Sequence, residues 1–344
     1  MESTNKKEIK IICTIGPATE EVDKIKGLAD AGMNIARCNF SHGSHEEHGR
    51  KFARIREVNE KFGKDIKIML DTKGPDIRLR TFENGSIMVN PGDIFSLYCD
   101  QDDRIGNQQG VAISHPDLYK YVKTGDTILI CNGLIISKVQ EVKAENKEIV
   151  VKIENSGKMA DKKSMAVPGV DVHLQFLRPE DVEDLKFGVE QKVDLIAASF
   201  VNKAEDIREM RKITGNTPII AKIESVQAVE NLDEIIAEAD GIMVARGDLG
   251  VEYPLEKLPT VQKIIIKKCN AANKFVVVAT EMMLNMMQKP RPSRAETSDV
   301  ANAVYDGTDA VMTSEETAMG EFPIETIQYM RKIANEAWSQ KYGK

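Results

Sequence analysis

Short apolar runs alternate with amphipathic segments over most of this chain. The first run, KIICTIGPA, leads into VDKIKGLADAG, whose apolar positions Val22, Ile25, Leu28 and Ala29 share one face of a helix. The run NIARCNF, the helical segment SHGSHEEHGRKFARIREVNEKFG and the run IKIMLDTK follow with short links. This order of strand, helix and strand predicts a parallel sheet.

The pattern changes after Gly74-Pro75. From about Asp76 to Pro168 the chain carries short alternating runs, including DIFSLYC, LIISKVQEV and EIVVKIE, separated by Gly, Asn and Asp. No helical period stands out in this stretch. We therefore predict a small antiparallel β domain, residues 75–168, inserted after the third strand, and we call it the insert.

The alternation of helices and strands resumes at Asp171 and continues to the end of the chain. Counting both parts gives eight strands and eight helices. This count predicts an α/β fold, a (β/α)8 TIM barrel built from residues 1–74 and 169–344, with a small β-barrel insert.

The composition excludes several classes of function. A chain of 344 residues that is 42% hydrophobic can bury a full core, and its net charge of −7 without a dense basic run argues against nucleic-acid partners. We expect no signal peptide and no membrane association, because the N-terminus lacks an apolar core and no run approaches about 20 apolar residues. Five cysteines without CxxC spacing indicate reduced thiols and a cytoplasmic location.

The stretch from Pro218 to Pro254 carries the densest candidate chemistry. Lys222 and Glu224 are two residues apart on the predicted strand PIIAKIE and so point to the same face. Asp248 follows the next strand, GIMVARGD, in a turn with Gly247 and Gly250. A lysine beside two carboxylates suits a divalent cation that meets a phosphoryl or carboxylate group. A buried Lys–Glu ion pair with an ordinary turn is the alternative.

Other predicted strands also end in polar residues, namely Arg37, Asn39, Ser41, Asp71, Thr72, Lys73 and Thr280. In a barrel the carboxyl ends of the strands meet at one face, where function concentrates. Four of these residues offer oxygen ligands with a single negative charge, which suits K⁺: Asn39, Ser41, Asp71 and Thr72. Glu224 and Asp248, with two negative charges, suit Mg²⁺ or Mn²⁺. By spacing alone, however, the neutral residues are also typical of strand-end hydrogen bonding.

Three histidines, His42, His45 and His48, recur every three residues before and within the second predicted helix. The spacing can be interpreted as a metal cluster, but it is not HExxH. Exposed histidines at the start of a helix are the more usual interpretation.

Over almost its whole length the chain resembles pyruvate kinase. The matching strings include GMNIARCNFSHG, MLDTKGPDIR, AKIES, GIMVARGDLGVE, KPRPSRAE and SDVANAVYDGTDAV, in the family's order. The resemblance implies a (β/α)8 barrel with a mobile β lid. It implies a transferase that moves the phosphoryl group of phosphoenolpyruvate to ADP, giving pyruvate and ATP in the last step of glycolysis.

The resemblance also implies roles for individual residues. Lys222 would stabilise the transferring phosphoryl group and Arg37 would contact the substrate phosphate. Gly247, Asp248 and Thr280 would bind substrate, with the hydroxyl of Thr280 near the end of a proton path. The nucleotide side would include Arg78, Lys163, His42 and Asn39. The K⁺ ligands would be Asn39, Ser41, Asp71 and Thr72, and the Mg²⁺ ligands Glu224 and Asp248.

The chain departs from the family pattern in several places. It stops after the eighth barrel helix, so we expect no C-terminal effector domain, no sugar-phosphate effector site and a small homo-oligomer such as a dimer through barrel faces. Glu281 and Glu315 stand where the family usually has other residues, and Cys131-Asn132-Gly133 replaces Asp-Asp-Gly on the lid.

These departures keep two alternatives open. One is a catalytically weak or inactive relative that binds phosphoenolpyruvate or nucleotide. The other is a Mg²⁺-dependent lyase or aldolase acting on keto acids, since such barrels also hold metal between a Glu and an Asp.

Overall fold

Eight parallel strands close into a barrel in the computed structural model, which describes residues 8–101 and 103–343. In the order around the barrel, the strands are β1 (Lys10–Thr14), β2 (Ile35–Asn39), β3 (Lys67–Asp71), β13 (Leu195–Ala198), β14 (Ile219–Ile223), β15 (Gly241–Ala245), β16 (Phe275–Ala279) and β17 (Ala310–Thr313). The predicted TIM barrel is therefore confirmed.

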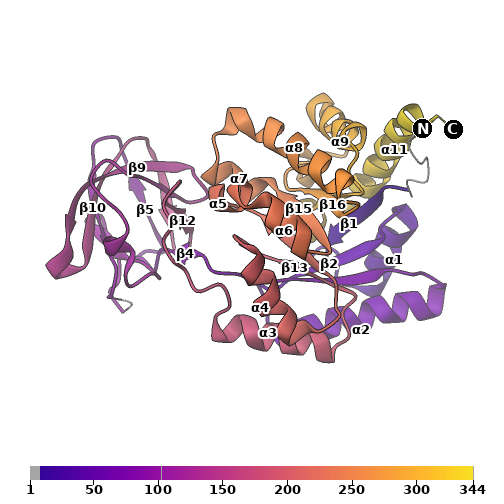
Figure 1. Cartoon of the computed structure of the whole chain (residues 1–344), viewed down its shortest axis with the longest axis horizontal. Helices are drawn as coiled ribbons and strands as arrows, with labels where there is room; N and C mark the ends of the chain where they lie inside the picture. The colour runs from indigo at the N-terminus through magenta and orange to yellow at the C-terminus, as the bar shows by residue number, and fades with distance from the viewer. Residues whose placement is uncertain (1–7, 102, 344) are drawn as a thin grey trace.

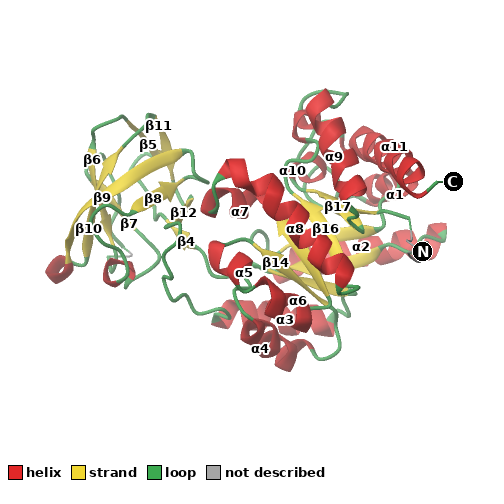
Figure 2. Cartoon of the chain, turned by 45° about the horizontal axis from the view of Figure 1, so that its top comes forward, coloured by secondary structure: helices red, strands yellow, loops and turns green. Residues whose placement is uncertain are grey.

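Helices surround this barrel (Figure 2). They are α1 (Val22–Ala31), α2 (His45–Phe62), α3 (Pro179–Glu190), α4 (Ala204–Thr214), α5 (Val226–Glu230), α6 (Leu232–Glu238), α7 (Arg246–Glu252), α8 (Leu258–Ala271), α9 (Arg294–Asp306), α10 (Glu315–Ala318) and α11 (Pro323–Tyr342). Local sequence explains their ends well in α2: Ser44 and Glu47 form a capping box at the start, and Gly63 ends the helix with a left-handed backbone.

Two local predictions are wrong. The segment AVENLDEIIAEA forms not one helix but two, α5 and α6, which meet at Asn231. There the Asn231 side chain donates a hydrogen bond to the carbonyl of Asn202, a tertiary contact that the helical period does not reveal. The expected turn after β15 is instead the short helix α7.

The insert lies to one side of the barrel (Figure 1) and consists mainly of strands, with two short 3-10 helices at Leu118–Lys120 and Ala144–Asn146. The strands are β4 (Ile77–Arg78), β5 (Ser86–Val89), β6 (Ile94–Tyr98), β7 (Gly110–Ala112), β8 (Thr127–Ile130), β9 (Ile135–Lys143), β10 (Glu148–Ile153), β11 (Gly157–Ala160) and β12 (Ser164–Ala166). Seven strands form one sheet in the order β4-β12-β8-β9-β10-β6-β7, and β5 pairs with β11. A single bridge between Leu79 and Ile113 joins the two edges of the larger sheet, so the insert approaches a closed barrel.

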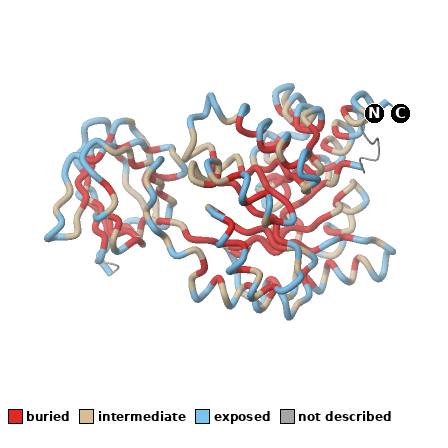
Figure 3. The backbone as a smooth tube through the Cα atoms, in the orientation of Figure 1, coloured by how far each residue is buried: buried red, intermediate tan, exposed pale blue. Residues whose placement is uncertain are grey.

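Buried residues gather in separate cores (Figure 3). One core fills the space between barrel strands and helices, a second lies inside the barrel, and a third occupies the insert. Each part of the molecule therefore has apolar packing of its own. Within the described residues, every helix is too short or too polar to cross a membrane.

The chain leaves and re-enters the barrel at one point. Gly74, which follows β3, has a φ of 70° and lies so close to Ser199 that an added Cβ would come within 2.7 Å of the Ser199 Cβ. The backbone of Gly74 is bound from the returning segment: its carbonyl accepts from Arg178 at 2.7 Å and its N–H donates to Asp181 at 3.3 Å. The boundaries of the insert at residues 75 and 168 stay a prediction.

Candidate active site

A cavity of about 930 Å³ lies between the carboxyl ends of the barrel strands and the insert. Ten of the candidate site residues from the sequence line it: Arg37, Asn39, Ser41, His42, Lys73, Arg78, Lys163, Lys222, Glu224 and Asp248. Four do not: Asp71, Thr72, Gly247 and Thr280. The ends of the strands thus converge on one cavity, as the barrel geometry requires. The four remaining residues lie at the same strand ends but do not face the cavity.

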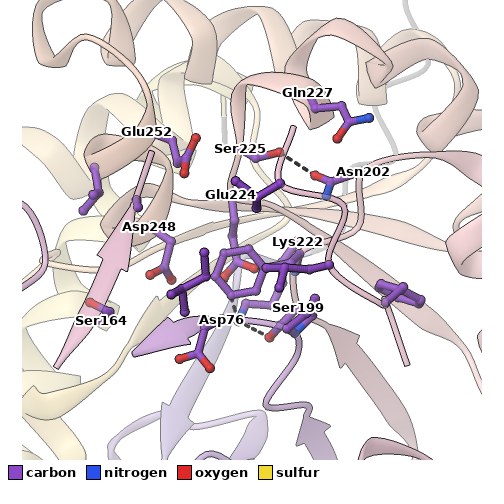
Figure 4. A pocket seen from close by; sticks show the side chains of 18 of the residues that line it. Asp76, Ser164, Ser199, Asn202, Lys222, Glu224, Ser225, Gln227, Asp248 and Glu252 are labelled. Atoms are coloured by element: carbon purple, nitrogen blue, oxygen red, sulfur yellow. Dashed lines mark hydrogen bonds and ion pairs between the residues drawn. The ribbon is translucent and has the colours of Figure 1, made fainter. Parts of the chain in front are cut away.

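Lys222, near the end of β14, is the best-held cation of the cavity. Its Nζ donates to Asp71 Oδ1 at 3.1 Å. It also donates to Ser199 Oγ at 2.7 Å and lies 2.9 Å from Glu224 Oε1; Figure 4 shows Lys222 between these two residues. The residue is only 8% exposed. Burial alone would lower the pKa of Lys222, but the charges of Asp71 and Glu224 outweigh it and raise the pKa, so the side chain stays protonated.

Asp71 is fully buried between two cations. Arg37 Nε donates to its Oδ2 at 2.5 Å and Lys222 donates to its Oδ1. Burial acts to raise the pKa of Asp71, but the charges of Arg37 and Lys222 overcome it and lower the pKa. The carboxylate therefore stays ionised and fixes both cations relative to each other.

Arg37 is further oriented by Thr14, whose Oγ1 accepts from Nη1 at 2.8 Å and donates to the carbonyl of Thr313 at 2.9 Å. Strands β1, β2 and β17 thereby hold one guanidinium in a single direction.

Glu224 and Asp248 form the acidic side of the cavity (Figure 4). Glu224 is fully buried; its Oε2 accepts from the Phe200 N–H at 2.6 Å, and its Oε1 forms an ion pair with the Lys222 ammonium at 2.9 Å. Burial, with a contribution from the charge of Asp248, raises the pKa of Glu224 despite the nearby Lys222. Carboxylate oxygens are the hard ligands that a divalent cation prefers, and its charge would neutralise the repulsion between Glu224 and Asp248, so the two carboxylates in this cavity fit Mg²⁺ or Mn²⁺.

No third acidic, histidine or cysteine ligand joins them within residues 8–101 and 103–343. A metal held here would therefore take its remaining oxygen ligands from substrate and water, which is usual for Mg²⁺.

The oxygen-rich group predicted for K⁺ lies on neighbouring strands. Asn39 and Asp71 are direct partners in the register of β2 and β3, so both side chains lie at the same edge and on the same side of the sheet. Asn39 Oδ1 accepts from the Ser41 N–H at 3.1 Å, which folds the segment into a tight turn. Thr72 Oγ1 accepts from the Ser199 N–H at 3.0 Å. The oxygens are those that a weakly charged cation prefers, although the charge of Asp71 is already balanced by Arg37 and Lys222.

Thr280 follows β16 in a strained backbone conformation, with a φ of 78°, and Glu281 has a φ of 56°. Positive φ is costly for a β-branched residue. Arg246 provides the compensation: its guanidinium donates to the carbonyls of Ala279 and Thr280, the shortest at 2.6 Å, while Asp299 accepts from it at 2.7 Å.

The strained turn brings Thr280 against Gly247. A Cβ at position 247 would come within 2.9 Å of Thr280 Cγ2, so only glycine permits this approach.

The residues predicted for the nucleotide side line the cavity between the insert and the barrel. Arg78 on β4 donates to Asp76 Oδ2 at 2.5 Å and to the carbonyl of Lys162 at 2.9 Å. Lys163, before β12, and His42, after β2, also line the cavity. Burial is the main cause that lowers the pKa of His42, with help from the charges of Arg78 and Arg37.

The histidine triplet is not a metal cluster. His45 pairs with Asp184 at 2.6 Å, and His48 is buried, stacks on Phe40 at 3.9 Å between ring centroids and contacts the carbonyl of His42 at 2.8 Å. The expectation of an exposed residue is wrong for His48, because the helix packs its first turn onto Phe40.

Several residues that shape the site were not singled out from the sequence. Ser199 supports Lys222, Arg246 supports the turn at Thr280, and Glu252 lines the cavity beside Glu315, which the family pattern had already marked as a departure. Arg246 lies within the string GIMVARGDLGVE, which could have indicated it. Ser199 is a lone serine after an apolar strand and carries no such signal.

Comparison with known proteins gives a consistent result. Residues 6–327 match a family model described as pyruvate kinase, barrel domain. Relatives named pyruvate kinase include those of Bacillus licheniformis, 49% identical over 96% of this chain and 57% of the relative, and of Clostridium acetobutylicum, 44% identical over 95% and 70%. A crystal structure of a pyruvate kinase from Cryptosporidium parvum superposes with a TM-score of 0.91 at 41% identity, covering 97% of this chain and 70% of that one. The chain thus spans just over half the length of the Bacillus relative.

Proposed function

Since this chain belongs to the pyruvate kinase family, we propose that it transfers the phosphoryl group of phosphoenolpyruvate to ADP, giving pyruvate and ATP. The observation that carries this proposal is the arrangement around Lys222: an ammonium held in a fixed direction by Asp71 and Ser199, beside Arg37 and across from two acidic residues. Phosphoryl transfer is catalysed mainly by positioning and by neutralising charge, and these residues supply both.

In this proposal each side chain has one task. Arg37 binds the substrate phosphate, while Lys222 donates a hydrogen bond to the oxygens that gain charge as the phosphoryl group moves. Two of the three N–H donors of Lys222 are committed to Asp71 and Ser199, and the third, which lies 2.9 Å from Glu224 Oε1, would turn to a phosphoryl oxygen when Glu224 holds the metal. Arg78 and Lys163 bind the nucleotide phosphates from the insert, with His42 and Asn39 on the same side.

The carboxylates of Glu224 and Asp248 would hold Mg²⁺ or Mn²⁺, which when bound supplies positive charge next to the phosphoryl oxygens. After transfer, the enolate must take up a proton on carbon. We assign the Thr280 hydroxyl to the end of that path, through water, because Gly247 and the Arg246 contacts hold it at the strand end.

Three finer assignments belong to the same proposal. We assign a K⁺ site to oxygen ligands at the ends of the neighbouring strands β2 and β3, because K⁺ prefers such oxygens: Asn39, Ser41, Asp71 and Thr72. The enzyme works in the cytoplasm, in keeping with five buried free cysteines. It forms a small homo-oligomer such as a dimer, which light scattering would test directly.

The decisive experiment is a coupled assay of pyruvate formation from phosphoenolpyruvate and ADP with Mg²⁺ and K⁺. We expect a turnover of about 1–1000 s⁻¹ for the chain, and its collapse in Lys222→Met and in Asp248→Asn. Lys267→Met, which removes an exposed lysine on α8, is the matched control and should retain full activity.

Other outcomes would change the assignment. Tight binding of phosphoenolpyruvate without turnover would favour the alternative of an inactive member of the family. Glu281 and Glu315, which replace the residues usual in the family, are the reason for considering it. Metal-dependent cleavage of a keto acid without nucleotide would favour the lyase or aldolase.

A further inference from the structure

Ser199 lies at the centre of the hydrogen bonds behind the cavity. It follows directly on β13, is only 2% exposed and borders the cavity with its neighbour Phe200, whose backbone is left-handed with a φ of 54°. Gly74 packs against it from the segment that leads into the insert. Ser199 is thus a nearly buried polar residue in the wall of the cavity.

The Ser199 hydroxyl has one hydrogen to donate, and the distances indicate where it goes. The carbonyl of Thr72 is 2.6 Å from Oγ, whereas Asp71 Oδ1 is 3.3 Å away, so the hydrogen bond to the carbonyl is the stronger. The hydroxyl oxygen then accepts from the Lys222 ammonium at 2.7 Å. In addition, the backbone N–H of Ser199 donates to Thr72 Oγ1, so Ser199 is bound to Thr72 at two points.

Among the three groups around the Lys222 ammonium, Ser199 is the only neutral one. Asp71 also balances the charge of Arg37, and Glu224 belongs to the acidic side of the cavity. A lysine side chain is flexible along four carbons and has no preferred fork geometry, so its direction depends on its contacts. Without the hydroxyl, the ammonium would be drawn between two carboxylates with nothing to hold it on the Thr72 side.

We propose that Ser199 is a positioning residue, which fixes the Lys222 ammonium by connecting it to the backbone carbonyl of Thr72. The inference rests on the proposed function, since Lys222 is the group that it serves. It also extends the site to β13, a strand that contributes none of the residues singled out from the sequence.

The test compares two substitutions at one position. Ser199→Ala removes the hydroxyl, and Ser199→Cys fills the same space with a much weaker hydrogen-bonding group. Ser137→Ala is the matched control, because Ser137 is a fully buried serine in the insert that also donates to a backbone carbonyl, that of Ile128, at 2.9 Å.

We expect kcat to fall by roughly 10- to 100-fold in both Ser199 variants, because a small misplacement of a catalytic group has an effect of that size. The KM for phosphoenolpyruvate should change less than about threefold, since the lysine acts in the transition state. In a Lys222→Met background, Ser199→Ala should cause no further loss of activity. An additive loss, or full rescue by Ser199→Cys, would show a packing role and overturn the proposal.

A readout without turnover separates this inference from the proposed function. In a crystal structure of Ser199→Ala we expect the Lys222 ammonium to leave its present position and move toward the carboxylates of Asp71 and Glu224. An unmoved ammonium would refute positioning by Ser199, even in an active enzyme. If instead the ammonium moves but the unmodified chain forms no pyruvate, the positioning holds and the proposed function fails.

Discussion

Acid should destabilise the barrel through His48, the buried residue of the first turn of α2. Its Nε2 lies 2.8 Å from the carbonyl of His42, which can only accept, so Nε2 carries the proton of the neutral ring. Its Nδ1 is buried without a partner among the described residues. A second proton would have to bind at Nδ1, where no acceptor among the described residues receives it. Burial therefore lowers the pKa of His48 to about 4.

The size of the effect follows from this shift. In the unfolded chain the pKa of His48 returns to the ordinary value of 6.5, so the unfolded state binds more protons between pH 6.5 and pH 4. The stability that neutral His48 contributes is therefore fully present above pH 6.5 and is lost as the pH falls toward 4. One pKa unit corresponds to about 1.4 kcal/mol, which gives a loss of about 2 kcal/mol at pH 5 and about 3 kcal/mol below pH 4.

Urea unfolding between pH 7.5 and pH 5 measures this loss. The chain has a single tryptophan, Trp338 on α11, so its fluorescence reports on the barrel and not on the insert. The unmodified chain should lose about 2 kcal/mol more of its unfolding free energy over this range than His48→Gln does. His173→Gln, at an exposed histidine, should behave as the unmodified chain. If the free energy of unfolding fell equally with pH in the unmodified chain and in His48→Gln, the reasoning would be refuted.

Two other substitutions test the site itself. Asp71→Asn should lower the free energy of unfolding by about 3–5 kcal/mol, because it leaves the cations of Arg37 and Lys222 buried without their shared carboxylate. Urea denaturation at neutral pH measures the effect, and a loss below about 1 kcal/mol would contradict it. Gly247→Ala should reduce kcat/KM for phosphoenolpyruvate by about tenfold or more, since the new methyl group must displace Thr280. Steady-state kinetics that match the unmodified chain would show that Thr280 can shift without consequence.

The barrel could be predicted because each of its strands carries its own local signal. Apolar runs such as those before Asp71 and Asp248 end in charge, and strand alternation alone places Lys222 and Glu224 on one face. Barrel closure then brings these ends together, and the cavity lining agrees with that expectation.

The supporting contacts could not be predicted, because they join residues far apart in the chain. Ser199 binds Thr72 and Lys222, and nothing in the sequence around a single serine indicates either partner. The break at Asn231 and the buried state of His48 have the same origin, since a tertiary contact overrides a local pattern in both. The family resemblance identified the groups that would touch substrate, but not those that hold them.

The insert, whose two ends meet where Arg178 contacts Gly74, affects the order in which the parts of the molecule fold. Strands β3 and β13 are neighbours in the barrel, yet the whole insert separates Asp71 from Leu195 in the chain. Closing so long a loop from an unfolded chain costs on the order of 4 kcal/mol in entropy. A folded insert already brings its two ends side by side, so most of that cost is met before the strands pair. We therefore expect pulse-labelling hydrogen exchange to show protection in β9 and β10 before β13, with the insert acting as the nucleus on which the barrel closes.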